Sequence, residues 1–216
     1  EDYYQNHGRD WERYAMIKAR VVAGDRVAGE RLLADLRPFV YRRYLDYSAF
    51  ASLRDMKVLI AQEIERKGMR GNVKLGPGGI REIEFIGQAF QLIYGGREPA
   101  LRERSILRVL DILATSGRLP VIAVTELKQA YDFLRRVENR LQAWADQQTH
   151  HLPEDDLAQL RLAFAMGFAN WRAFTAELTR HGEAVTQQFT QVFGDPAATD
   201  AKPQGTRADL ALLWQA

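Results

Sequence analysis

The sequence predicts an all-α protein, a multi-helix bundle of about seven to eight helices with one long central helix. Two observations lead to this prediction. Apolar residues recur every three or four positions in one segment after another, which is the spacing of a buried helix face. No segment alternates apolar and polar residues over the length of a strand, and glycines or prolines separate the helical patterns.

The composition is that of a soluble globular protein. Of its 216 residues, 46% are hydrophobic and 27% are charged, which is enough for one substantial core. A net charge of +2 is too small to favour nucleic acid or an acidic membrane surface as a partner. The absence of cysteine, of a long apolar run and of a signal peptide favours the cytoplasm. The chain begins without Met, so we expect a piece of a longer polypeptide.

The N-terminal part contains three helical patterns. The first covers residues 1–25 and is interrupted only by Gly8 before it ends. Asp25 is placed to cap the second helix, which Pro38 is expected to kink or end. A third helix is expected over 48–67, where Ser48 is its cap.

Basic residues gather in the first of these patterns. Arg13, Lys18 and Arg20 fall within two helical turns of one another. A guanidinium binds an oxyanion through two parallel hydrogen bonds, so these side chains could hold phosphate groups. The other interpretation is a basic helix surface that pairs with neighbouring acidic residues.

The stretch KLGPGGIREIEF, residues 74–85, joins a glycine-rich loop to the start of a helix. Such a loop can present free N–H groups to an anion, and Lys74 and Arg81 would add positive charge at its two ends. Beyond the loop a polar stripe accompanies the apolar one along the helix. Its members are Arg81, Glu84, Gln88 and Gln91. The stretch matches no usual phosphate-loop template, and a helix cap with a solvated polar face is the other interpretation.

Four further helical patterns follow. They cover 103–116 and 124–148, then a short helix that starts at Asp155 or Asp156, and a last helix that Asn170 caps. The pattern over 124–148 is the longest in the sequence. These patterns complete a helical domain over 1–194. Residues 195–206 read as a linker, and 207–216 as the start of a connecting helix.

His150 and His151 are adjacent and look like metal ligands, but successive side chains diverge on a helix. Asp146 stands four residues earlier, where the helical pattern runs out. We therefore predict no metal site in this chain. No carboxylate pair or nucleophile–base pair stands out either, so the residues alone predict a helical domain with a possible anion-binding loop.

Four blocks of sequence resemble one family closely. They are GRDWERYAMIKARVVAGD (8–25), NVKLGPGGIREIEFIGQAFQLIYGGREPALRERS (72–105), FLRRVENRLQ (133–142) and DQQTHHLP (146–153). In order and spacing they resemble the glutamine synthetase adenylyltransferases, two-headed enzymes that attach AMP to glutamine synthetase and remove it. The wording GPGGIREIEF and the QTH-LP ending resemble the N-terminal half, which removes AMP.

The resemblance implies a reaction in which phosphate attacks the AMP–tyrosine bond of modified glutamine synthetase and forms ADP. It also implies Mg²⁺ held by aspartates of a nucleotidyltransferase core. The acidic motif of that core is absent here, so the resemblance implies no catalytic residue in this fragment, which alone would be inactive. Its expected partners are glutamine synthetase, a PII-type signalling protein and the nucleotides ATP, ADP and AMP, but neither nucleic acid nor a membrane.

The resemblance and the chemistry together suggest which residues contact nucleotide or phosphate. Lys74, Gly78, Gly79 and Arg81 are the expected contacts, with Glu84 and Gln88 orienting them. Arg13, Lys18 and Arg20 are a second basic contribution. Because the core is missing, we also expect an exposed face around 8–25 and 72–88.

Other classes of protein remain open. The chain could be a docking or regulatory module that binds glutamine synthetase or PII without contacting nucleotide, and a large uncovered apolar patch would distinguish it. It could also belong to the related uridylyltransferases, which carry a similar helical segment, although the motif wording fits the adenylyltransferases better. A free-standing hydrolase ranks last because catalytic groups are lacking.

Overall fold

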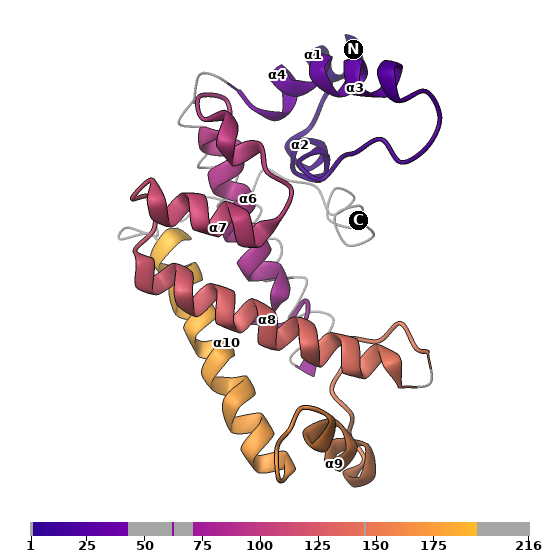
Figure 1. Cartoon of the computed structure of the whole chain (residues 1–216), viewed down its shortest axis with the longest axis vertical. Helices are drawn as coiled ribbons and strands as arrows, with labels where there is room; N and C mark the ends of the chain where they lie inside the picture. The colour runs from indigo at the N-terminus through magenta and orange to yellow at the C-terminus, as the bar shows by residue number, and fades with distance from the viewer. Residues whose placement is uncertain (1, 43–61, 63–70, 145, 194–216) are drawn as a thin grey trace. The chain divides into compact units, whose positions relative to one another are not determined.

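In a computed structural model, the structure describes residues 2–42, 62, 71–144 and 146–193 (Figure 1). Helices account for all the regular structure of these residues apart from an isolated β-bridge between Asn72 and His151, so the all-α prediction is confirmed. The helix expected over 48–67, the linker at 195–206 and the helix at 207–216 lie outside the described residues. No helix in the described ranges is both long and apolar enough to cross a membrane.

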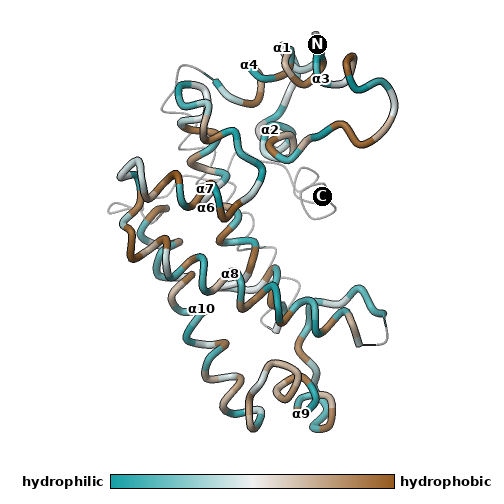
Figure 2. The backbone as a smooth tube through the Cα atoms, in the orientation of Figure 1, coloured by the Kyte–Doolittle hydropathy of each residue, from teal (hydrophilic) through white to brown (hydrophobic). Residues whose placement is uncertain are grey.

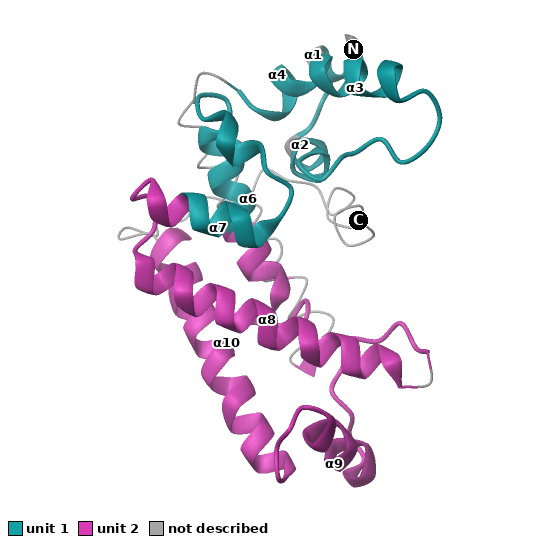
Figure 3. Cartoon of the chain, in the orientation of Figure 1, with its two compact units in different colours: residues 1–61, 87–112, 200–216 teal, residues 62–86, 113–199 magenta. Residues whose placement is uncertain are grey.

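The contacts divide the chain into two compact units (Figure 3). The first contains residues 1–61, 87–112 and 200–216, and the second contains 62–86 and 113–199. Helix α6 (Ile80–Tyr94) contributes to both units, because the division falls within it. Each unit is described by itself below.

In the first unit, α1 (Asp2–Asn6), α2 (Asp10–Met16), α3 (Arg26–Asp35) and α4 (Arg37–Val40) precede α6. The Asp25 side chain caps α3 by accepting from the N–H groups of Val27 at 2.9 Å and Ala28 at 3.1 Å, as predicted. Pro38 sits in the first turn of α4, directly after the end of α3, so the predicted break is confirmed. The first pattern, however, is helical only to Met16, and extended and turn residues follow it up to Asp25.

The polar stripe on α6 is not a solvated face, so that part of the cap interpretation is wrong. Gln88 is 4% exposed and Gln91 is fully buried. The Gln91 amide donates at 2.6 Å to the carbonyls of both Leu101 and Glu103. It thereby fixes the end of the 3₁₀ helix η2 (Pro99–Arg102), after which α7 (Ile106–Thr115) begins. A buried side chain is polar here because the turn beside it has carbonyls to satisfy.

The second unit is built on two helices of 23 residues each, α8 (Val121–Ala143) and α10 (Trp171–Phe193), which pack against each other. The predicted long helix is confirmed in α8, although α10 equals it in length. Apolar and polar residues alternate along both, as expected for helices with one buried side (Figure 2). The short α9 (Asp156–Ala165) joins them, and the side chains of Asp155 and Asn170 cap α9 and α10, as predicted.

Candidate functional site

Asn72 organises the glycine-rich loop. Its side-chain oxygen accepts from the N–H groups of Lys74 at 3.1 Å and Leu75 at 2.9 Å, and its carbonyl accepts from Gly76 N at 2.8 Å. Asparagine is suited to this position because a side-chain oxygen can close a turn in place of a backbone carbonyl. Asn72 is 5% exposed, so these hydrogen bonds form in the interior.

Replacing Asn72 by alanine should lower the free energy of unfolding by about 1–3 kcal/mol, because two partly buried N–H groups lose their acceptor. Urea denaturation followed by circular dichroism measures this loss. Asn139→Ala is the matched control, since Asn139 lies exposed on α8. If both variants are equally stable, Asn72 does not organise the loop.

The N–H groups at the start of α6 are already used within the protein. Gly79 N donates to Gly76 O at 3.0 Å, and Arg81 N donates to Lys74 O at 2.9 Å. Gly78 N donates to the Glu82 carboxylate at 3.0 Å. An anion would have to displace these partners, so the loop backbone does not form the ready-made anion site that a free helix N-terminus offers.

The glycines instead allow close packing. Gly78 has a φ of +70°, and a β-carbon there would lie 2.4 Å from the carbonyl oxygen of Gly182 on α10. A β-carbon on Gly79 would lie 2.7 Å from Gly76 O. Only glycine fits either position, because the loop backbone passes against backbone on both sides.

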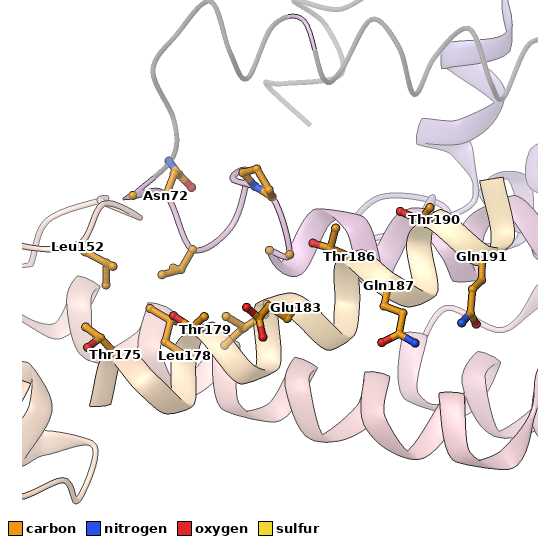
Figure 4. A pocket seen from close by; sticks show the side chains of 17 residues that line it. Asn72, Leu152, Thr175, Leu178, Thr179, Glu183, Thr186, Gln187, Thr190 and Gln191 are labelled. Carbon is orange, nitrogen blue, oxygen red and sulfur yellow. The ribbon is translucent and has the colours of Figure 1, made fainter. Parts of the chain in front are cut away.

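A groove of about 800 Å³ runs between this loop and α10. Figure 4 shows its α10 wall, where Thr175, Thr179, Thr186 and Thr190 are spaced along the helix, and Leu152 lies at its far end. The threonines contribute uncharged hydroxyl groups, and Glu183 is the one charged side chain among the described residues of the lining. The lining surface of the groove is mostly apolar and carries little charge, and the basic residues of the loop are not part of it.

The segment at 150–152 clamps the loop from the other direction. Val73 N donates to His150 O at 2.9 Å, and Leu152 N donates to Gly71 O at 3.0 Å. His151 Nε2 lies 3.1 Å from the Asn72 amide nitrogen. The two histidines therefore serve different partners, and the described residues contain no cluster of three or more potential metal ligands.

A buried carboxylate on α8 connects this segment to the long helix. Glu138 is 3% exposed, and its two oxygens lie 2.6 Å from Arg135 Nη1 and 3.1 Å from His150 Nδ1. A second pair lies on α6, where Arg81 Nη1 is 3.9 Å from Glu84. Glu84 also hydrogen-bonds Tyr131 of α8, whose pKa is raised by burial and by that carboxylate.

Of the residues expected to bind nucleotide, Lys74, Arg81 and Glu84 lie half-buried in the second unit. Arg13, Lys18 and Arg20 belong to the first unit and differ in how far they are buried. Arg13 is 7% exposed with its guanidinium over the Phe39 ring, and Lys18 Nζ donates to Arg104 O at 2.5 Å. Arg20 is exposed. The structure does not determine how the two units sit relative to each other.

The expected exposed face is wrong for 72–88. Most of this segment is buried, and Pro77 is its only exposed residue. The reason is that the loop lies between α10 and the 150–152 segment of its own unit. In 8–25 the exposed part is confined to its beginning and its end.

Sequence reasoning missed Asn72, Arg135 and His150 as members of this site. Glu138 was noted only as a polar position in the middle of the long helical pattern. The one available signal was that FLRRVENRLQ and DQQTHHLP belong to the same set of blocks as the loop.

Two histidines make the stability of the second unit depend on pH. Burial lowers the pKa of His150, helped by Lys74, and burial lowers that of His181, helped by Arg180. Because the unfolded chain then binds protons first, stability is full above about pH 6.5 and falls as the pH drops below that value. We expect the free energy of unfolding to decrease between pH 7 and pH 5.

Urea denaturation across that range measures the effect, and His181→Gln should flatten the curve. The exposed His7, replaced by glutamine, is the control for the histidine-to-glutamine substitution itself. Glu103 and Glu177 have lowered pKa values, so they stabilise the folded protein in their charged forms. This contribution is lost in a more acidic range than that of the histidines, as the pH falls through about 4.5 and below. An unchanged stability from pH 7 to pH 5 would contradict the role of the histidines.

The fold and the site define the class of protein. It is an all-α domain in which Arg135, Glu138 and His150 form a cluster beside a glycine-rich loop, and its described residues contain no cluster of metal ligands. A family model described as GlnD PII-uridylyltransferase matches residues 54–193, and one described as glutamate-ammonia ligase adenylyltransferase matches residues 1–35. The chain belongs to the family of the first model, which matches more than half of its residues.

Relatives that are similar to nearly the whole chain share the name bifunctional glutamine synthetase adenylyltransferase/adenylyl-removing enzyme. The protein of Nitrosococcus oceani is 59% identical over 99% of this chain, and that of Pseudomonas aeruginosa is 58% identical over 100% of it. The protein of Thioalkalivibrio sulfidiphilus is 56% identical over 99%. The chain spans 22% of the length of each of these relatives. Residues 54–193 match a model described as a uridylyltransferase, whereas these relatives are named adenylyltransferases, so both alternatives are represented among the similar proteins.

Proposed function

We propose that this chain is the helical part of the deadenylylating half of a bifunctional glutamine synthetase adenylyltransferase. One observation carries the proposal: three of the four sequence blocks that resemble this family meet at the glycine loop. The block at 72–105 supplies the loop and Arg81, the block at 133–142 supplies Arg135 and Glu138, and the block at 146–153 supplies the clamp. Blocks that come together around charged side chains favour a shared chemical role over separate structural ones.

In the proposed reaction, an oxygen of inorganic phosphate attacks the phosphorus of the AMP–tyrosine bond. The attacking oxygen forms a new bond to this phosphorus while the bond from phosphorus to the tyrosine oxygen breaks. The tyrosine oxygen takes up a proton, and the AMP group and the added phosphate leave together as ADP. Lys74 and Arg81 contact the phosphate groups as they approach, and Glu84 holds Arg81 in position. Two cationic side chains lower the cost of bringing these anions together.

The residues that the structure describes do not fit a magnesium site. Among those that the structure describes, no group of three His, Asp or Glu side chains could hold a metal ion. We therefore assign Mg²⁺ to aspartates of a nucleotidyltransferase core outside this chain. The chain then provides contacts for the substrate and acts in the cytoplasm on glutamine synthetase, under control of a PII-type protein.

The test is phosphorolysis of AMP-modified glutamine synthetase, followed as ADP release. The chain alone should be inactive, and restoring the upstream segment should restore the reaction. Arg81→Ala with an intact fold should then abolish most of it. Activity of the chain alone would overturn the proposal.

A second function, docking of glutamine synthetase, is favoured by a separate surface. Leu157, Leu160 and Phe164 lie on one side of α9 and are 55%, 51% and 81% exposed. Trp144 lies beside them, 57% exposed, with the Arg161 guanidinium 4.6 Å from its ring centre. An uncovered apolar stripe of this kind is typical of a protein contact.

Binding of glutamine synthetase to the immobilised chain tests this second function. Phe164→Asp should weaken binding, whereas Val121→Asp, at another exposed apolar position, should leave it unchanged. Equal binding by both variants would remove α9 from consideration.

A further inference from the structure

Glu138 is an unusual residue for the middle of a packed helix. Its side chain is 4% exposed, although a carboxylate loses much hydration energy on burial. Two groups compensate for this loss, the Arg135 guanidinium at 2.6 Å and the His150 ring at 3.1 Å. The carboxylate therefore holds a side chain of α8 and a side chain of the 150–152 clamp in fixed orientations.

Arg135 keeps most of its hydrogen-bonding capacity. Its side chain is 42% exposed, and its ion pair with Glu138 uses one of the five N–H donors that a guanidinium carries. Its neighbour Arg136 has a different environment, because it is 58% exposed and lies 4.0 Å from Asp132 on the same helix. Only the first of these two arginines is fixed by a buried group.

Lys74 brings a second cation to the same place. It follows Val73, whose N–H donates to the carbonyl of His150 at 2.9 Å. Burial is the largest cause of the lowered pKa of His150. Lys74, His151 and Arg135 lower this pKa further, whereas Glu138 raises it. Lys74 and Arg135 therefore both lie close enough to His150 to act on its charge.

We propose that Lys74, Arg135 and His150 form a binding site for a phosphate group, with Glu138 as the residue that positions Arg135 and His150. Lys74 supplies a flexible ammonium group, Arg135 supplies a planar guanidinium held in a fixed orientation, and the His150 ring gains a proton when an anion approaches. This combination suits a tetrahedral oxyanion. The inference rests on the proposed function for its choice of ligand, which is either free inorganic phosphate or the diphosphate of ADP.

The test is a calorimetric titration of the whole chain with sodium phosphate and, separately, with ADP at constant ionic strength. Arg135→Gln should weaken binding at least about 10-fold, because a charge-assisted hydrogen bond is lost. Arg136→Gln is the matched control and should change affinity by less than about 2-fold. Tighter binding of phosphate than of ADP would identify the free ion as the ligand, and the reverse order would identify the nucleotide.

A measurement on the unchanged chain protects the inference against misfolding of a variant. Saturating phosphate should raise the pKa of His150, followed by NMR of its ring, and should shift the amide signals of Lys74 and Arg135. No binding, or equal binding by Arg135→Gln and Arg136→Gln, would overturn the inference. If Arg135→Gln abolishes phosphate binding while the parent enzyme keeps full phosphorolysis, the site is supported and the proposed function fails.

Discussion

Gly78→Ala should destabilise the second unit by about 2–5 kcal/mol, the largest loss expected for any single methyl group in this loop. Two costs add up. An alanine at a φ of +70° is strained, and its β-carbon would lie 2.4 Å from the backbone oxygen of Gly182. Backbone cannot move aside as a flexible side chain can, so loop and helix must separate. Urea denaturation followed by circular dichroism measures the loss.

Gly117 separates the two costs. It has a φ of +67°, but a β-carbon there would meet no atom within 4 Å. Gly117→Ala should therefore show the conformational strain alone, about 1–2 kcal/mol. Gly182→Ala should be neutral or slightly stabilising, since its own β-carbon meets open space and alanine favours a helix. Equal losses at Gly78 and Gly117 would mean that the loop does not depend on contact with α10.

Several predictions from sequence that depend on local causes were correct. Glycines before Ile80 predicted the loop and the start of α6, and Asp25 and Asn170 predicted two caps. These features depend on residues within a few positions of one another. Periodicity alone was therefore enough to establish the all-α class.

The polar contacts could not be predicted because their partners are distant in sequence. Gln91 has the spacing of a surface residue, and only the carbonyls of 101–103 explain its burial. Glu138 is buried and its neighbour Asn139 is exposed, and this difference depends on His150, which Glu138 contacts from a distant part of the sequence. The sequence also predicted that the apolar stripe of the long helix continues to Trp144. In the structure α8 ends at Ala143, and the Arg161 guanidinium lies over one face of the Trp144 ring.

The second large effect concerns catalysis by the parent enzyme. Lys74→Ala and Arg81→Ala should each slow phosphorolysis of AMP-modified glutamine synthetase by about 100-fold or more, the usual effect of removing one group that stabilises developing negative charge. Both side chains are half-buried, where their charges act more strongly than in water.

The control for these variants is Arg172→Ala, which removes an exposed positive charge on α10, away from the loop. It should change the rate by less than about 2-fold. Full activity of both Lys74→Ala and Arg81→Ala, with ADP release equal to that of the control, would reduce the glycine loop to a helix cap.

The most direct test of the central claim is to measure AMP removal and AMP attachment by the same full-length bifunctional enzyme carrying Lys74→Ala. If this helical segment serves the deadenylylating half, removal should fall by about 100-fold while attachment stays within about 2-fold of the unmodified enzyme. Loss of attachment with removal unchanged would contradict the account and assign the segment to the other half.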